Sequence, residues 1–417
     1  MKRFLCFFVI IVMLTACNRN SIITDPEAVE KLNNPQTRTI EFWHTYSDEE
    51  THLLEQELIP AFEKQNPGIR VHPVRHANNI ELKYTLIAKA SANRSPDVVR
   101  MDVAWVPEFS QSGLLTPLNG FHDFESVVSL LQSSAGLVGY YEGFNYSLPV
   151  NINTKVAIYN RSLLTQAGLS SPPERFEEVI KLARKERYMI GLGGLDTWKT
   201  LPCIYALGGK MTDDQYKQAT GYLNSKATVH AVEELVSLYQ EQLIDRTVVN
   251  GGGDNWEGVK SGNILVTDEG PWFYSVFQGD ELSRALNSTI AVPFPHEFGP
   301  SSIVGGEDLV IPKGAKQPEE AWEFMKFMTS KPSQEIMAQT GLIPTNREAK
   351  VKNAALGSII RPYEEALNNS FLRPPVKAWS QIDEIYTSYM TRIFQGELSA
   401  EEGLTKAASE IDIVLER

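Results

Sequence analysis

SGNILVTDEGPWFY, residues 261–274, joins a short apolar run to an abrupt stop and a large aromatic side chain. The apolar run at 264–266 predicts a buried β-strand, which Gly270 and Pro271 end just before Trp272. In an open α/β sheet the carboxyl ends of the strands border the ligand crevice, so Trp272 could offer a flat apolar platform there. A Trp that fills the protein core would show the same local pattern, and both interpretations stay open.

The N-terminus has the features of an export signal followed by a lipid-attachment cysteine. Two basic residues precede an apolar run, residues 4–14, that is too short to span a bilayer as a helix. Residues 14–17, Leu-Thr-Ala-Cys, resemble the lipobox of bacterial lipoproteins, which is cut before the cysteine that then receives lipid. We therefore expect a signal peptide over 1–16, a lipid-anchored linker over 17–37 with lipid on Cys17, and a location on the extracytoplasmic face of the cell membrane. A signal peptide with a chance cysteine is the alternative.

The composition is that of a soluble globular protein with enough chain for two domains. About 400 residues remain after the leader, more than a single hydrophobic core usually supports. A formal net charge of −13 argues against nucleic acid as a partner, because phosphate backbones require a basic surface. Apart from Cys6 in the leader and Cys17, Cys203 is the only cysteine. We expect no internal disulfide and a buried, apolar role for Cys203 rather than a nucleophilic one.

Strands and helices alternate after residue 38. Ser47 and Glu50 form a capping-box pattern that predicts a helix directly after the first strand. The expected elements are strands at 39–44, 69–74 and 97–102, and helices after Ser47 and at 80–93. Such alternation predicts an α/β fold with a mostly parallel sheet covered by helices.

The second half of the chain predicts a crossing and a return. Residues 146–160, YSLPVNINTKVAIYN, are β-prone but contain a Pro and two central Asn, which favours an edge or crossing segment over a central strand. We place the first crossing between domains there. Further strands are expected at 291–295 and 308–312, with the connection passing between sheets. Pro318 opens a predicted helix, and the tail 380–415 is helical.

Four segments together resemble one family: 95–115, 146–160, 261–273 and 304–328 are similar to the extracellular solute-binding proteins of sugar ABC importers, a group that includes maltodextrin-binding proteins. The resemblance implies an α/β, two-lobe, periplasmic-binding-protein-like clamshell with crossing hinge strands. The implied N-terminal lobe comprises 38–148 and 304–340, and the implied C-terminal lobe comprises 149–303 and 341–417.

The resemblance also implies a function. A sugar or oligosaccharide would bind between the lobes and close them, and an ABC permease would receive it from the closed protein. We expect a monomer without cofactor or metal, and no enzymatic activity.

A pyranose ring has an apolar face and a rim of hydroxyl groups, so a sugar site needs aromatic platforms with acids and amides beside them. At the positions that match the family, the expected contacts are Trp43, His44, Asp102, Trp105, Asn151, Asn153, Trp198, Trp272, Gly306, Glu307 and Trp379. Each has a simpler role available: the Trp side chains could fill cores, Asp102 could cap a turn, His44 could lie on the surface, and Glu307 could brace the crossing.

Two rival functions remain open. The same fold could bind a non-sugar solute such as a metal, a polyamine or a peptide; Tyr140 and Tyr141 invite comparison with ferric binders, although strand packing explains them as well. A secreted glycoside hydrolase is the other rival, but its chemistry needs two carboxyl groups at a fixed separation, and no motif pairs two acids in this way.

Overall fold

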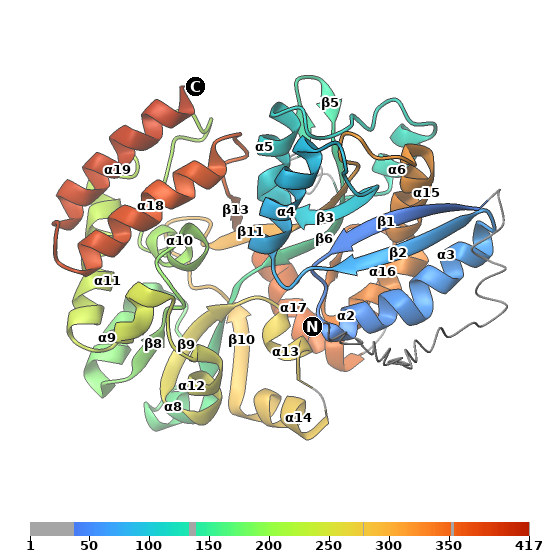
Figure 1. Cartoon of the computed structure of the whole chain (residues 1–417). Coiled ribbons are helices and arrows are strands. Elements are labelled where there is room, and N and C mark those ends of the chain that lie inside the picture. Colours follow the sequence, from blue (N-terminus) through green and yellow to red (C-terminus); the bar gives the residue numbers. More distant parts are fainter. Residues whose placement is uncertain (1–36, 133–138, 278, 352–353, 417) are drawn as a thin grey trace, which may run out of the picture. The chain divides into compact units, whose positions relative to one another are not determined.

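The chain from Arg38 to Arg417 folds as one unit around two β-sheets with helices packed against them (Figure 1). This computed structural model describes residues 37–132, 139–277, 279–351 and 354–416. No helix in these segments is both long enough and apolar enough to cross a membrane.

The larger sheet has the strand order β12-β6-β11-β3-β1-β2, and β13 also pairs with β11. Its strands are β1 (Arg38–His44), β2 (Ile69–Arg75), β3 (Val98–Asp102), β6 (Ser147–Thr154), β11 (Ser302–Val310), β12 (Ile343–Pro344) and β13 (Ser370–Leu372). β1 is parallel to β2 and β3, as the alternating pattern predicts, but β11 runs antiparallel to both β3 and β6. The expectation of a mostly parallel sheet is therefore wrong for the sheet as a whole, because β11 re-enters it from the opposite end.

The smaller sheet has the order β10-β7-β9-β8. Its strands are β7 (Val156–Asn160), β8 (Met189–Gly191), β9 (Ile264–Glu269) and β10 (Thr289–Pro293). The strand predicted at 264–266 is thus β9, a fully buried strand between β7 and β8. A separate hairpin joins β4 (Tyr140–Tyr141) to β5 (Phe144–Asn145).

Extended strands connect the two sheets. β6 belongs to the larger sheet and β7 to the smaller one, and a single residue, Lys155, separates them. The return runs from β10 to β11, which pairs with β6 along most of its length. The crossing expected at 146–160 is confirmed, and β11 begins earlier than predicted, at Ser302. We call β6 and β11 the crossing strands.

Helices cover both sheets. They are α2 (Asp48–Leu53), α3 (Ile59–Gln65), α4 (Asn79–Ser91), α5 (Val106–Gln111), α6 (Phe124–Ser129), α8 (Arg161–Gln166), α9 (Phe176–Glu186), α10 (Thr197–Ala206), α11 (Lys226–Gln240), α12 (Asn255–Ser261), α13 (Trp272–Ser275), α14 (Gly279–Ser288), α15 (Pro318–Met328), α16 (Lys331–Met337), α17 (Ala354–Leu367), α18 (Trp379–Phe394) and α19 (Ala400–Leu415). Shorter turns are the π-helix Leu54–Leu58 and the 3-10 helices Val103–Trp105, Arg246–Asn250 and Ala338–Thr340.

The capping box before α2 is present as predicted, since the Ser47 side chain accepts from the Glu50 backbone and the Glu50 side chain accepts from the Ser47 backbone.

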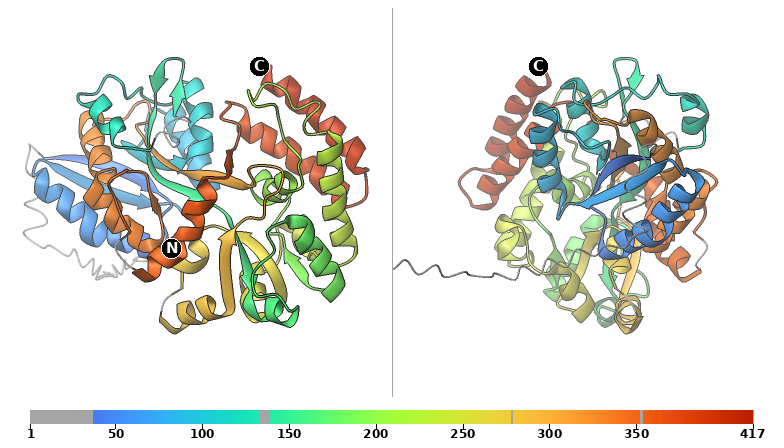
Figure 2. Two further views of the ribbon diagram at one scale, coloured as in Figure 1. Left: turned by 180° about the vertical axis from the view of Figure 1, so that it is seen from behind. Right: turned by 45° about the vertical axis from the view of Figure 1, so that its right-hand side comes forward.

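Alternating side chains of β1 enter two different cores. Ile40 and Phe42 pack with α3 and α15 on one face of the larger sheet, while Trp43 packs with α4 and α5 on the other. Figure 2 shows α17, in orange-red, beside the crossing strands when the molecule is seen from behind, and α17 also contacts β7 and β10. The larger sheet is therefore buried on both faces.

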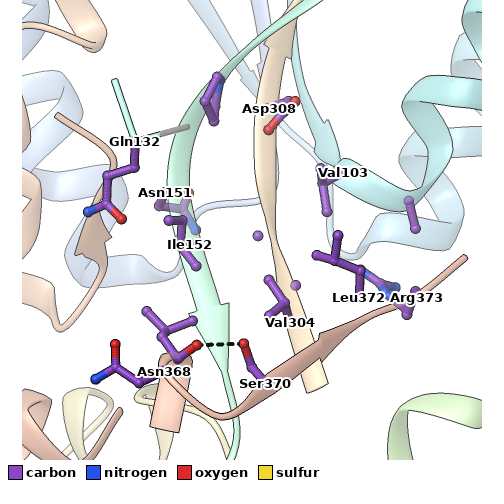
Figure 3. Close-up of a pocket in the computed structure, with 15 residues that line it drawn as sticks. Val103, Gln132, Asn151, Ile152, Val304, Asp308, Asn368, Ser370, Leu372 and Arg373 are labelled. Carbon is purple, nitrogen blue, oxygen red and sulfur yellow. Dashed lines mark hydrogen bonds between the residues drawn. The ribbon is translucent and has the colours of Figure 1, made fainter. Parts of the chain in front are cut away.

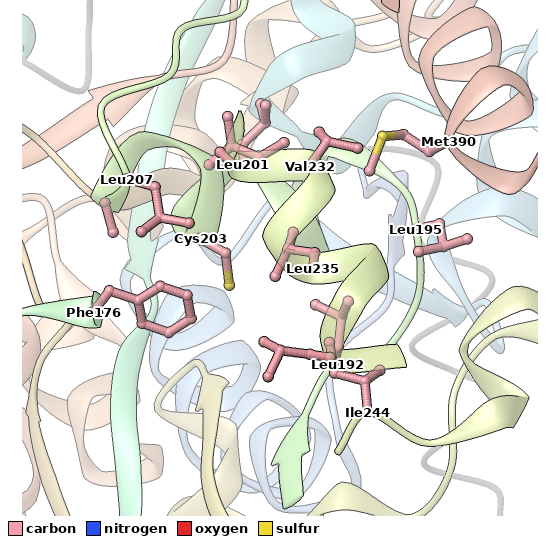
Figure 4. Close-up of a cluster of buried hydrophobic side chains, with 14 of the residues drawn as sticks. Phe176, Leu192, Leu195, Leu201, Cys203, Leu207, Val232, Leu235, Ile244 and Met390 are labelled. Carbon is pink, nitrogen blue, oxygen red and sulfur yellow. The ribbon is translucent and has the colours of Figure 1, made fainter. Parts of the chain in front are cut away.

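The helices beside the smaller sheet share a core with side chains from α10, α11, α18 and α19. Figure 4 shows part of it, with Cys203 of α10, Leu235 of α11 and Met390 of α18. Cys203 lies in this core, 4% exposed, so the prediction of a buried apolar role is confirmed. Burial raises the pKa of its thiol, which keeps the sulfur protonated and unreactive.

Candidate functional site

Two tryptophans that begin helices lie beside each other. Trp198 is in the first turn of α10, which Asp196 caps by accepting from the Lys199 backbone at 3.1 Å. Trp272 follows the Gly270-Pro271 stop after β9. Their ring centroids are 6.4 Å apart and their planes differ by 31°. Both side chains are half-buried, so this indole pair keeps an accessible aromatic surface.

Charged groups hold the indole pair in place. The Trp272 indole N–H donates to Glu269 Oε2 at 2.8 Å, and the Lys199 amine lies 3.6 Å from the same carboxylate. Burial alone would raise the pKa of Glu269, but the nearby lysines and the indole N–H groups outweigh burial and lower it. Beneath Trp198, the fully buried Lys155 pairs with Asp268 and donates to the Trp198 carbonyl at 3.1 Å. The charged residues that hold the two indole rings are therefore paired with one another, Lys155 with Asp268 and Lys199 with Glu269.

A second group of polar side chains projects from the crossing strands and from β3. We call Arg100, Asn151, Asn153 and Glu307 the hinge polar cluster. Glu307 Oε2 accepts from the Arg100 guanidinium at 2.9 Å and from both amide side chains. Burial raises the pKa of Glu307 while Arg100 opposes the rise. Most of the cluster's polar atoms bond to one another, although Arg100 Nε has no hydrogen-bond partner among the described residues, and the cluster combines carboxylate, amide and guanidinium groups that can bind a polar solute.

The indole pair and the hinge polar cluster meet at β11. A Cβ atom added to Gly305 would lie 2.9 Å from the Trp198 ring, so the indole rests directly on the strand backbone next to Glu307. Arg373, just after β13, lies over the same ring at 5.3 Å and donates to Asp102 Oδ1 at 2.7 Å. The sequence-predicted residues of the crossing thus come together with Trp198 and Trp272.

Three other residues that the sequence predicts as sugar contacts have local structural contacts of their own. Asp102 accepts from the Ala104 backbone at 2.8 Å, so it caps the following turn in addition to pairing with Arg373. Gly306 has a φ of +145°, and a Cβ there would lie 2.4 Å from the Asn151 carbonyl oxygen, so a side chain has no room. Trp105 is half-buried, with the Lys83 amine 5.3 Å from its ring centroid.

The remaining predicted residues lie in hydrophobic cores. Trp43 is 3% exposed and packs with α4 and α5; its ring centroid lies 4.5 Å from that of His76. Trp379 is also 3% exposed, within the core of α18 and α19. His44 is fully buried, and burial together with Arg100 lowers its pKa to about 3. In this structure these three side chains contact protein atoms rather than solvent.

Sequence reasoning missed several charged residues at the site. Arg100 and Lys155 both interrupt apolar, β-prone runs, and a charge in such a run is itself a signal of a buried partner or a site. Asp268 had the same signal within β9. Arg373 had none, because it lies in an irregular Pro-containing segment and meets Asp102 only through the fold.

The described residues show no group of three His, Cys, Asp or Glu side chains that could hold a metal ion. Tyr140 and Tyr141 form β4, and Tyr141 donates to Glu142, so both take part in a hairpin. The chemistry of the site is therefore that of flat apolar rings next to hydrogen-bonding groups.

A fold of two linked α/β sheets with such a site at the crossing defines a class of binding proteins. A model of the bacterial extracellular solute-binding proteins matches residues 57–355, more than half of the chain. The chain belongs to this family. A model of the prokaryotic membrane lipoprotein lipid attachment site matches residues 1–18, which include Cys17. The protein is thus lipid-anchored on the extracytoplasmic side of the membrane.

Relatives and solved structures agree with this assignment. A binding protein of Brucella abortus (strain 2308) is 23% identical over 375 residues, which are 87% of this chain and 90% of the relative. The maltotriose-binding protein of Pyrococcus abyssi is 22% identical over 354 residues, 80% of this chain and 72% of the relative. The GacH receptor of Streptomyces glaucescens, solved without ligand and with acarbose, superposes with a TM-score of 0.79 at 26% identity and covers 91% of this chain and 99% of its own.

Proposed function

We propose that this solute-binding protein captures a sugar or an oligosaccharide at the crossing and delivers it to an ABC import permease. The observation that carries the proposal is the contact between Trp198 and the backbone of β11 beside Glu307, which sets the indole pair next to the hinge polar cluster. A sugar needs both kinds of group at once, a flat apolar surface and acceptors in the plane of its hydroxyl groups. The oligosaccharide ligands in the names of the relatives support the same class of ligand.

In the proposed complex the indole pair stacks on the sugar. Its hydroxyl groups replace some of the hydrogen bonds that the cluster now makes internally, and Asp102, Trp105 and the backbone at Gly306 complete the contacts. The buried Trp43, His44 and Trp379 are assigned to packing around the site. The binding lobes proposed are 38–148 with 304–340, and 149–303 with 341–417.

The proposal includes a monomeric protein, lipid on Cys17 and no turnover of the bound sugar. Asp102 and Glu307 occupy paired positions on β3 and β11, but each carboxylate is held by a guanidinium, Arg373 and Arg100 respectively. Such pairing suits acceptance of hydrogen bonds better than proton donation to a leaving group.

A thermal-shift screen against monosaccharides and oligosaccharides tests the proposal. A sugar at 100 times its dissociation constant should add about 2.7 kcal/mol to the free energy of unfolding. The best sugar is then titrated into the Trp198→Ala variant, which should bind it more weakly than the wild type. Stabilisation by polyamines or peptides and by no sugar would overturn the proposal, and so would release of hydrolysis products from a tightly bound oligosaccharide.

A further inference from the structure

Three polar side chains from α4, α5 and α18 meet at one point. Lys83 of α4 donates to Glu108 Oε2 of α5 at 2.8 Å and to Ser380 Oγ of α18. Ser380 Oγ in turn donates to Glu108 Oε2 at 2.7 Å, so each of the three side chains contacts both others. The Lys83 and Glu108 side chains are only 12% and 28% exposed, so the contact is partly shielded from water. We call Lys83, Glu108 and Ser380 the polar bridge.

The polar bridge joins parts of the chain that lie far apart in the sequence. Lys83 and Glu108 belong to 38–148 of the proposed N-terminal lobe, whereas Ser380 belongs to 341–417 of the proposed C-terminal lobe. Figure 1 shows α4 and α5 next to β3, and α18 next to α19. The contact therefore runs from one proposed lobe to the other, and what we infer from it rests on the proposed function.

The polar bridge also completes the start of α18. Ser380 is the second residue of this helix, and the preceding Ala378 has only a methyl group, which cannot accept a hydrogen bond from the free N–H groups of the first turn. Glu108 brings a carboxylate to this helix start, where the helix dipole favours negative charge. The negative charge at the start of α18 is thus supplied by the other lobe.

The polar bridge connects the helices that follow two walls of the cavity at the crossing. This cavity of about 390 Å³ belongs to the proposed sugar site, since Asn151 and Arg373 line it (Figure 3). Val103 in one wall leads into α5, while Leu372 and Arg373 in the opposite lobe lead into α18. The ion pair of Arg373 with Asp102 is a second contact between the same two lobes. Separating α18 from α5 would therefore part the two walls.

We propose that the polar bridge is a latch between the lobes that delays release of the bound solute. Movement of α18 away from α5 takes the Ser380 hydroxyl from both charged partners, while Lys83 and Glu108 stay paired within their own lobe. Hydrogen bonds to charged groups contribute more than those between neutral groups. The latch therefore stabilises the form in which the lobes are in contact, and the solute leaves from the form in which the latch is broken.

The first test measures the contact between the lobes and needs no sugar. Spin labels are attached through Ala88→Cys on α4 and Glu384→Cys on α18, both at exposed positions, in the full-length protein in detergent. Cys17 carries lipid and Cys203 is buried, so neither takes a label. Pulsed electron resonance then gives the distribution of distances between the labels. In Ser380→Ala the ratio of molecules at longer distances to those at the wild-type distance should rise about tenfold.

Two further variants make the distance test decisive. Ser388→Ala removes an exposed hydroxyl from the same helix, and its distances should equal those of the wild type. Glu108→Gln keeps the size of the side chain but loses its charge, so it should raise the same ratio as Ser380→Ala does. If both Ser380→Ala and Glu108→Gln show the wild-type distances, the polar bridge does not hold the lobes together and the proposal is wrong.

The second test measures release. The best sugar from the thermal-shift screen is displaced from each protein in a stopped-flow experiment. Dissociation should be about tenfold faster from Ser380→Ala than from the wild type, and Ser388→Ala should match the wild type. An unchanged dissociation rate together with altered distances would overturn the role of the latch in retention. A protein that binds no sugar would contradict the proposed function, while the label distances would still show whether the latch joins the lobes.

Discussion

The carboxyl ends of β1 and β9 carry similar aromatic sequences, yet the fold uses them differently. β1 ends in Trp43 and His44: helices α4 and α5 cover Trp43 on one face of the sheet, and His44 is buried on the other face beside Phe42 and Tyr46. β9 ends at Glu269, and the Gly270-Pro271 turn lifts Trp272 out of the strand, where it stays half-buried beside Trp198. An aromatic at a strand end therefore indicates a platform only where a turn breaks the strand and no helix covers it.

The largest expected effect lies at the end of β1. Trp43→Ala should lower the free energy of unfolding by about 3–5 kcal/mol, because it leaves a cavity among the side chains of α4 and α5. Denaturant unfolding measures the loss. The folded fraction should bind sugar with unchanged affinity, and Trp43→Phe should lose less stability. If Trp43→Ala keeps its stability but loses sugar binding, Trp43 is a binding residue and its assignment to the core is wrong.

His44, at the end of β1, should make the free energy of unfolding of the protein depend on pH. Its pKa is near 3 in the folded protein and near 6.5 when unfolded, so the unfolded chain binds more protons between these values. Stability is therefore lost as pH falls, by about 2 kcal/mol between pH 7 and pH 5 from this group. Unfolding curves at both pH values should show a smaller difference for His44→Gln than for the wild type. The exposed His52→Gln serves as control, and equal slopes for all three proteins would contradict the assignment.

Substitution at the end of β9 should have the reverse pattern of effects, weakening sugar binding more than it lowers stability. Trp272→Ala should weaken binding of the best sugar by about fivefold, since a stacked ring contributes roughly 1 kcal/mol beyond burial. Calorimetric titration measures the affinity. The free energy of unfolding should change less than in Trp43→Ala, because Trp272 is half-buried. Unchanged affinity would place Trp272 among the packing residues and remove the contrast between the two ends.

The smallest expected effect is that of Gly305→Ala, which tests whether contact with β11 positions the Trp198 ring. Gly305→Ala would bring a methyl group to 2.9 Å from the Trp198 ring and push the ring away from β11. We expect about a two- to threefold loss of sugar affinity, since one added methyl group is partly absorbed by small shifts. Tryptophan fluorescence should change in the absence of ligand. A normal spectrum with normal affinity would show that Trp198 does not depend on this contact.

Local patterns explain which parts of the fold were predictable. The capping box before α2, the stop after β9 and the crossing at 146–160 depend on neighbouring residues, and all three are present. The mixed direction of the larger sheet was not predictable from alternation, because it depends on where the returning strand β11 inserts. Strand pairing between distant segments leaves no local trace in the sequence.

The candidate site, like the fold, was predictable only in part from the sequence. Asn151, Asn153 and Glu307 were singled out from motifs, and the fold brings them together. Their partner Arg100 could have been noticed as a charge within an apolar strand. Arg373 could not, because it reaches Asp102 only after β13 has joined the sheet.

The sequence by itself determined an exported, lipid-anchored α/β chain with two linked sheets, since apolar periodicity, caps, turns and the leader act over short distances. The tertiary structure decided which aromatic side chains are sealed in cores and which remain at the crossing. It also decided that one strand presents Glu307 to the hinge polar cluster and Asp308 to a cavity. Burial and pairing are set by contacts between segments far apart in the chain, and such contacts exist only once the sheets have formed.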